Sequence, residues 1–144
     1  MMVFPVKTIS LNWRNFTCLI AICLLPLFAG CEKNDDLVAI VSFETIEPVI
    51  TITGIETGGN IRANRNIEIT EYGVVFNTTG NPTIEAGTIS PGSDISVTEV
   101  GSRYLIEFNS RVTVLSSGAT YYIKAYITTR TGTAYGNQVS YTVN

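Results

Sequence analysis

The pattern of hydrophobic and polar positions divides the chain into two parts. Residues 16–28 form an uncharged run (FTCLIAICLLPLF) in which Thr17 is the one polar residue, and the residues before it contain Lys7 and Arg14 but no acid. From Leu37 onward, apolar residues alternate with polar ones over short stretches, and no long segment repeats at helical spacing. The pattern therefore predicts an apolar leader followed by an all-β body.

Short strands account for the body. Alternating or β-branched stretches occur at residues 37–41, 49–53, 67–69, 72–76, 104–114, 121–128 and 135–143. A turn at Gly54 or at Gly58-Gly59-Asn60 closes the second stretch. The alternation reverses its phase at Thr70-Glu71, which predicts a β-bulge or a switch of face there. Because no helical crossover is available for parallel pairing, we expect an antiparallel β-sandwich of about seven strands.

The stretch at residues 121–128 shows how the two faces of a strand are expected to differ. The positions expected to face the core are Tyr121, Ile123, Ala125 and Ile127. The other phase places Tyr122 and Tyr126 on the outer face, with Lys124 between them. Outward tyrosines could stack on a sugar or anchor a protein partner. The pattern favours the alternative, in which they only pair with aromatic neighbours across strands.

The leader is typical of a secretory signal peptide, helical and cleaved, which we assign to residues 1–30. A basic start, an apolar core and a small-residue exit are the three parts of such a signal. The alternative is a transmembrane anchor, but the run has 13 residues where a span needs about 20. Pro26 near its end also suits a cleavage site better than a spanning helix.

The segment Leu27-Phe28-Ala29-Gly30-Cys31 resembles the lipobox of bacterial lipoproteins. The resemblance implies cleavage before Cys31, lipid attachment to its sulfur, and anchoring of the mature chain at the outer membrane. Cys18 and Cys23 lie in the apolar run and would leave with the signal. Because Cys31 alone remains, we expect no intramolecular disulfide in the mature protein.

Residues 31–37 are expected to be the lipidated cysteine and a short acidic tether. The segment Glu32-Lys33-Asn34-Asp35-Asp36 is too charged and too short to pack, so a solvated arm explains it. It is also similar to the export signal of surface lipoproteins in Bacteroidetes-type bacteria. The sequence leaves both interpretations open.

Composition and charge exclude several classes of function. The chain contains no histidine, which excludes Ser-His-Asp triads, Cys-His dyads and histidine-ligated metal sites. Nine basic residues against twelve acidic ones give a net charge of −3, the wrong sign for a nucleic-acid partner. Glu68 and Glu71 are the one pair that could act together, and only through a bulge, since they are three positions apart. We therefore expect no catalytic residue, no cofactor and no metal site.

The last third of the body resembles a fibronectin type III domain. The segment 115–121 (LSSGATY) has the Leu, Gly and Tyr spacing of that family's corner before its penultimate strand. The segments 121–126, 132–141, 71–74 and 81–84 are similar to a version found in Bacteroidetes-type lipoproteins. The resemblance implies an immunoglobulin-like sandwich over residues 38–144. It also implies a hydrogen bond between the Tyr121 hydroxyl and the backbone a few residues upstream.

These features predict a non-enzymatic, lipid-anchored protein of the cell envelope at the outer membrane. We expect a surface module that binds or presents a glycan, a matrix component or an envelope-protein partner. The alternative is a periplasm-facing structural subunit of an outer-membrane complex. In either case the membrane is contacted through the N-terminal lipid.

Overall fold

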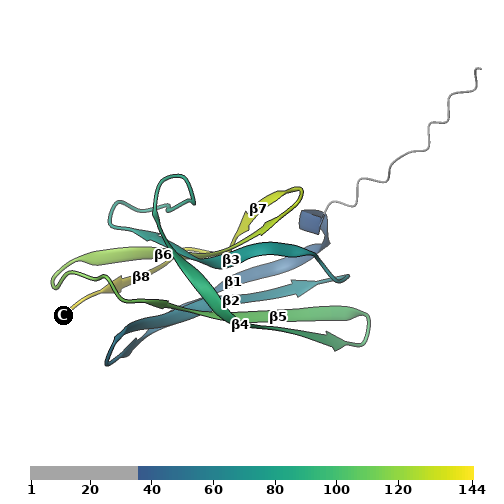
Figure 1. The fold of residues 1–144 in the computed structure, drawn as a ribbon, viewed down its shortest axis with the longest axis horizontal. Helices are drawn as coiled ribbons and strands as arrows, with labels where there is room; N and C mark the ends of the chain where they lie inside the picture. The colour runs from purple at the N-terminus through teal and green to yellow at the C-terminus, as the bar shows by residue number, and fades with distance from the viewer. Residues whose placement is uncertain (1–35) are drawn as a thin grey trace, which may run out of the picture. The chain divides into compact units, whose positions relative to one another are not determined.

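The computed structural model describes residues 36–144, and this part of the chain is an all-β, antiparallel structure (Figure 1). The signal segment and Cys31 lie outside the described residues. A single 3₁₀ turn, η2 (Asp36–Ala39), precedes the strands. The eight strands are β1 (Ile40–Thr51), β2 (Gly54–Ala63), β3 (Ile69–Asn77), β4 (Thr88–Val100), β5 (Arg103–Val112), β6 (Thr120–Thr129), β7 (Gly132–Tyr135) and β8 (Val139–Thr142).

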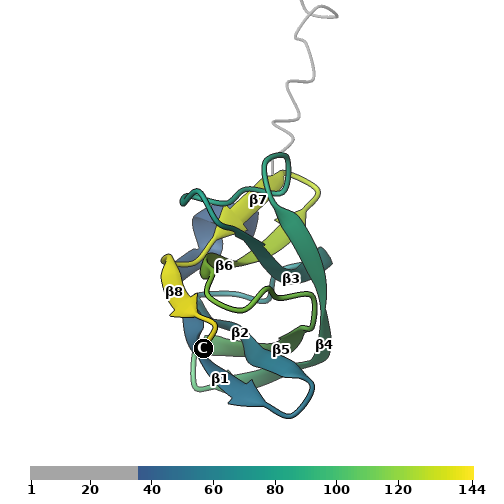
Figure 2. The same cartoon turned by 90° about the vertical axis from the view of Figure 1, so that its left-hand side faces the viewer.

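The strands form one curled sheet in the order β1-β2-β5-β4-β3-β6-β7, with β8 also paired to β6. Strand β4 turns the corner of this sheet, because its first part, to Pro91, pairs with β3 and its later part, from Gly92, pairs with β5. Seen along the strands, the sheet nearly closes into a barrel (Figure 2).

The core lies inside this curl, where the inward phases of the strands meet. Strand β6 contributes the predicted phase, and all four of its expected core residues are buried. Buried side chains from other strands include Ile61, Val74, Phe76, Ile106, Phe108 and Val112. In β5 and in the first part of β6 alternate residues are buried, so the period-two pattern of the sequence identifies their core side.

The turn before β6 contains the predicted tyrosine contact. The amide N–H of Ser116 donates a hydrogen bond to the Tyr121 hydroxyl, over 3.0 Å. The ring of Tyr121 packs edge-on against Phe76, with centroids 5.9 Å apart. Gly118 supplies the left-handed backbone (φ 79°) that this turn requires.

Hydrogen bonds of Thr45 fasten β1 to the far edge of the sheet. The buried Thr45 hydroxyl donates to the carbonyl of Asn137 (2.5 Å) and accepts from the amide of Ala125 (2.9 Å). The Thr45 amide donates to Oδ1 of Asn137 (2.9 Å). A side chain at Gly136 would place its Cβ only 2.6 Å from the Thr45 hydroxyl oxygen. One threonine and one close glycine therefore close the gap that the sheet order leaves between β1 and β6.

Two strands differ from the sequence expectations. Strand β4 was not predicted, because almost all of its residues are exposed and no buried face marks it. Of the two alternatives for the turn after residues 49–53, the one at Gly54 is confirmed, since β1 ends at Thr51 and β2 begins at Gly54, whereas Gly58 and Gly59 lie in the middle of β2. A Cβ atom on Gly59 would lie 2.5 Å from the Phe108 ring, so glycine here permits close packing. The predicted bulge at Thr70-Glu71 is confirmed by a register shift between Ile69 and Glu71.

The start of the folded body also differs from its expected boundary. Asp36 was expected in a solvated tether, but its side chain is only 9% exposed and its Oδ1 lies 3.7 Å from Nη2 of Arg65. Ala39 in the same turn is part of the core. The folded body therefore includes η2. Between residues 36 and 144, no helix is long and apolar enough to span a membrane.

Candidate functional site

The outer face of β6 was the strongest sequence candidate for a binding surface, and the structure corrects it. Tyr126 was expected to point outward and be exposed, but it is completely buried. Tyr122 is half-buried and pairs with Asn77 on one side and Ser140 on the other. The two tyrosines therefore do not form an open aromatic platform, and Tyr126 serves packing.

The segment between β3 and β4 covers this face. Asn81 accepts a hydrogen bond from Nζ of Lys124, and its amide donates to Oε1 of Gln138 (2.6 Å). The amide of Ile84 donates to the hydroxyl of Tyr135 (3.1 Å), the residue that pairs with Tyr126 on β7. Pro82 is fully buried. Residues 78–87 are thus a packed cover over the outer side of β6, visible above the sheet in Figure 1.

The Tyr126 hydroxyl is tied to a carboxylate under this cover. It donates a hydrogen bond to Oε1 of Glu71, over 2.9 Å. Burial raises the pKa of the Tyr126 hydroxyl above its ordinary value, and the hydrogen bond to Glu71 and the negative charge of Glu71 raise it further. The neutral hydroxyl is therefore the form that the fold requires.

Alkaline pH is expected to destabilise the fold through this group. Because the pKa is higher in the folded state, the stabilisation is complete below pH 10, the ordinary pKa of tyrosine, and is lost as the pH rises above it. The loss amounts to about 1.4 kcal/mol of unfolding free energy per pH unit. Thermal unfolding followed between pH 9 and 12 should show a steeper fall for the wild type than for Tyr126→Phe. Equal slopes for the two proteins would contradict the assignment.

Glu68 and Glu71, the candidate pair of carboxylates, have different partners. Oε2 of Glu68 lies 2.8 Å from Nη2 of Arg130, whereas Glu71 accepts from Tyr126. The bulge between Ile69 and Glu71 changes their phase, but each carboxylate is held by its own contact. Neither is arranged to exchange a proton with the other.

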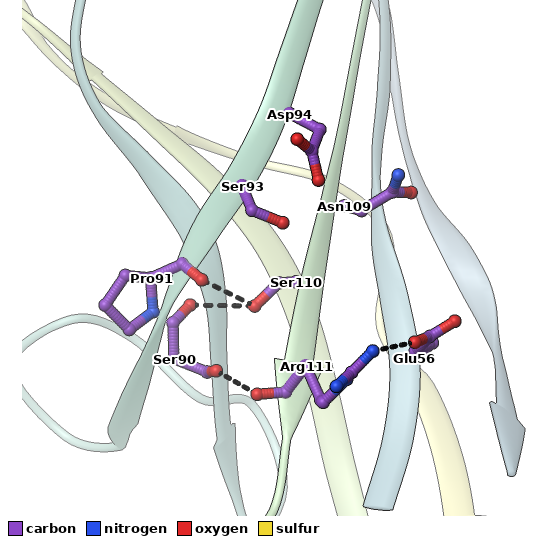
Figure 3. A pocket seen from close by; sticks show the side chains of 8 residues that line it. All are labelled: Glu56, Ser90, Pro91, Ser93, Asp94, Asn109, Ser110 and Arg111. Carbon is purple, nitrogen blue, oxygen red and sulfur yellow. Dashed lines mark hydrogen bonds and ion pairs between the residues drawn. The ribbon is translucent and has the colours of Figure 1, made fainter. Parts of the chain in front are cut away.

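A polar cleft of about 560 Å³ lies where β4 passes from β3 to β5 (Figure 3). Its residues are Glu56, Ser90, Pro91, Ser93, Asp94, Asn109, Ser110 and Arg111. The floor is held by hydroxyl groups: Ser90 donates to the carbonyl of Arg111 (2.6 Å), and Ser110 donates to the carbonyls of Ser90 and Pro91 (both 3.0 Å). On the side toward β2, Arg111 pairs with Glu56.

The upper part of the cleft contains polar side chains, and Figure 3 marks no hydrogen bond or ion pair between them. The side chains of Ser93, Asp94 and Asn109 lie together there in Figure 3. Asp94 has a left-handed backbone (φ 52°), next to a register shift between β4 and β5, and such bulges re-aim side chains. A carboxylate, an amide and a hydroxyl can exchange hydrogen bonds with a hydroxyl-rich ligand. Sequence reasoning missed this cleft because it missed β4.

The opposite end of the body from the chain entry carries exposed aliphatic side chains. The hairpin between β1 and β2 ends in Val49, Ile50 and Ile52, all well exposed, and Ile52 is fully so. Val114 is also exposed and follows β5 beside the same turn, where Ile55 pairs with Val112. We call Val49, Ile50, Ile52 and Val114 the distal tip. Because β1 starts beside η2 and runs for 12 residues, the tip lies about 40 Å from the entry.

Comparison of the chain with protein-family models, with curated proteins and with solved structures yields no match. Within residues 36–144, no three histidine, cysteine, aspartate or glutamate side chains are grouped to hold a metal ion.

Proposed function

We propose that this protein is a non-enzymatic, lipid-anchored module of the cell envelope that presents a binding surface away from its membrane. The lipid is carried by Cys31, after cleavage of residues 1–30, and the outer membrane is the site of anchoring. This part of the proposal rests on the lipobox-like segment that ends in Cys31.

We propose further that the body is a sandwich of the immunoglobulin and fibronectin type III kind. The order β1-β2-β5-β4 and the group of β3, β6 and the last two strands correspond to the two sheets of an immunoglobulin constant-type domain. The hydrogen bond between Ser116 and Tyr121 supports this, since tyrosines at this corner bond to upstream backbone in such domains. Residues 36–144 lack cysteine and tryptophan, which favours the fibronectin type III version.

The observation that carries the binding role is the position of the distal tip relative to the chain entry. From Cys31 to Asp36 the chain can span about 16–18 Å, so a lipid on Cys31 would hold the η2 end of the body near the bilayer. The aliphatic tip then points away from that membrane. Exposed aliphatic groups favour a protein partner over a sugar, because sugar recognition uses aromatic faces and polar groups. Anchoring raises the effective concentration of such a weak binding surface.

The anchor is tested by replacing its sulfur. We expect the wild type to fractionate with membranes and the Cys31→Ser chain to be released, because no other acylation site remains after cleavage. Protease treatment of intact cells then separates the two orientations. Digestion of the wild type supports a surface module, whereas protection favours the periplasm-facing structural subunit. Membrane fractionation of Cys31→Ser like the wild type would refute the lipid anchor.

A further inference from the structure

One long edge of the sheet has no strand partner. From Ser93 to Val100, β4 pairs with β5 on one side, and within residues 36–144 no strand pairs with its other side. All eight residues of this segment are exposed, on both faces of the strand. Exposed aliphatic side chains at Ile95, Val97 and Val100 lie along it. An edge of this kind is a template for pairing with another strand.

The other outer strand, β1, is interrupted along its length, whereas β4 is interrupted only before Ser96. Strand β1 contains Pro48 and two register shifts, between Ile40 and Ser42 and between Ile46 and Val49, and β4 has one shift, between Ser93 and Ser96. These are features that block pairing at an edge. Between Ser96 and Val100, β4 has no proline, no lysine and no register shift. The free edge of β4 is therefore regular enough to accept a strand.

We propose that this edge pairs with the same edge of a second copy of the chain, antiparallel and centred on Val97. Two-fold pairing must join each residue to a residue on the same face. This centre pairs the regular segment Ser96-Val97-Thr98 with itself and sets Ile95, at the end of the bulge, opposite Glu99. Val97 then faces Val97 of the second copy, and Ser96 faces Thr98 in both directions. Pairs of β-branched residues and of hydroxyl residues stabilise neighbouring strands.

Charge complementarity supports this register. Neither Asp94 nor Arg103 has an ion pair among the residues that the structure describes. Arg103 lies beside Val100 on β5, and the proposed register brings the bulge of the second copy, which carries Asp94, next to Val100. Two strand spacings, about 10 Å between backbones, separate Arg103 from that carboxylate, which an arginine side chain can span. The contact occurs twice by symmetry.

The same register avoids contact between like charges. Glu99 faces Ile95 of the second copy, so its carboxylate meets an aliphatic side chain and not another acid. An unrelated strand would have to match three aliphatic, two hydroxyl and two charged positions between Asp94 and Val100 independently. The same edge of a second copy offers a partner at each of these positions, which is why a second copy is the favoured occupant.

Disulfide trapping tests the pairing in membranes from cells that produce the full chain. Facing residues of antiparallel strands have Cα atoms about 4.5–5.5 Å apart, within the range for a disulfide. Ile95 lies about 13 Å from Ile95 of the second copy in this register, so Ile95→Cys is the matched control. We expect oxidised Val97→Cys chains to run mostly as dimers on a non-reducing gel, at least five-fold above Ile95→Cys. The unsubstituted chain measures any background from Cys31.

Two further samples complete the test. Cells producing Ile95→Cys and Glu99→Cys together should give cross-linked dimers that neither variant gives alone. Adding Arg103→Glu to Val97→Cys should lower the dimer yield several-fold, because it places like charges opposite Asp94. A Val97→Cys yield no greater than that of Ile95→Cys overturns the proposal. An unchanged yield with Arg103→Glu overturns the register. The pairing does not require the lipid, so its failure is separate from failure of the anchor.

Discussion

Replacing Tyr126 by alanine is expected to lower the free energy of unfolding by about 3–5 kcal/mol, as for other large buried rings. The side chain is completely buried. Truncation leaves a cavity and removes the hydrogen bond to Glu71. Urea unfolding of the variant and the wild type, followed by tyrosine fluorescence or circular dichroism, measures the difference.

Tyr122→Ala is the matched control, on the same strand and the same face. Because Tyr122 is only half-buried, we expect a loss below about 1.5 kcal/mol. Tyr126→Phe keeps the ring and should cost about 1 kcal/mol, the value of one hydrogen bond. Equal losses for Tyr122→Ala and Tyr126→Ala would contradict the packing role. Such a result would mean that Tyr126 is accessible and could bind a ligand.

The part of the fold that the sequence predicts well is the core side of its alternating strands. In β6 the alternation from Tyr121 to Ile127 defines that side, and the reversal at Thr70-Glu71 correctly indicates a bulge. Both follow from the same physics, since alternate residues of a strand point to the same face. The spacing from Leu115 to Tyr121 also predicts a specific hydrogen bond that is present.

Where a strand is exposed on both faces, or covered on both, the alternation of the sequence gives no signal or a wrong one. Strand β4 is exposed on both faces over most of its length, so nothing in its sequence requires alternation. The expectation that the outer face of β6 is exposed is wrong for the opposite reason, because residues 78–87 cover this face. A signal for this was available in Val74-Val75-Phe76, three consecutive buried residues, since an unbroken apolar run indicates a strand covered on both sides. The candidate site was therefore misplaced for a reason visible in its neighbouring strand.

Replacing Thr45 by valine is expected to cost at least about 2 kcal/mol, although the two side chains have the same shape. The hydroxyl satisfies two backbone groups, the carbonyl of Asn137 and the amide of Ala125. Each buried polar group left without a partner costs about 1–3 kcal/mol. Because these bonds fasten β1 to the far edge of the sheet, the loss should appear as opening between β1 and β6.

Thr57→Val is the control for this substitution. Thr57 is equally buried on the neighbouring strand, but its hydroxyl makes one hydrogen bond, to the carbonyl of Ile46 (2.5 Å). Urea unfolding should therefore show a smaller loss than for Thr45→Val. Amide hydrogen exchange should accelerate at Ala125 in Thr45→Val and remain unchanged there in Thr57→Val. If both variants lose the same stability and Ala125 stays protected in each, the near-closure of the barrel depends on contacts other than Thr45.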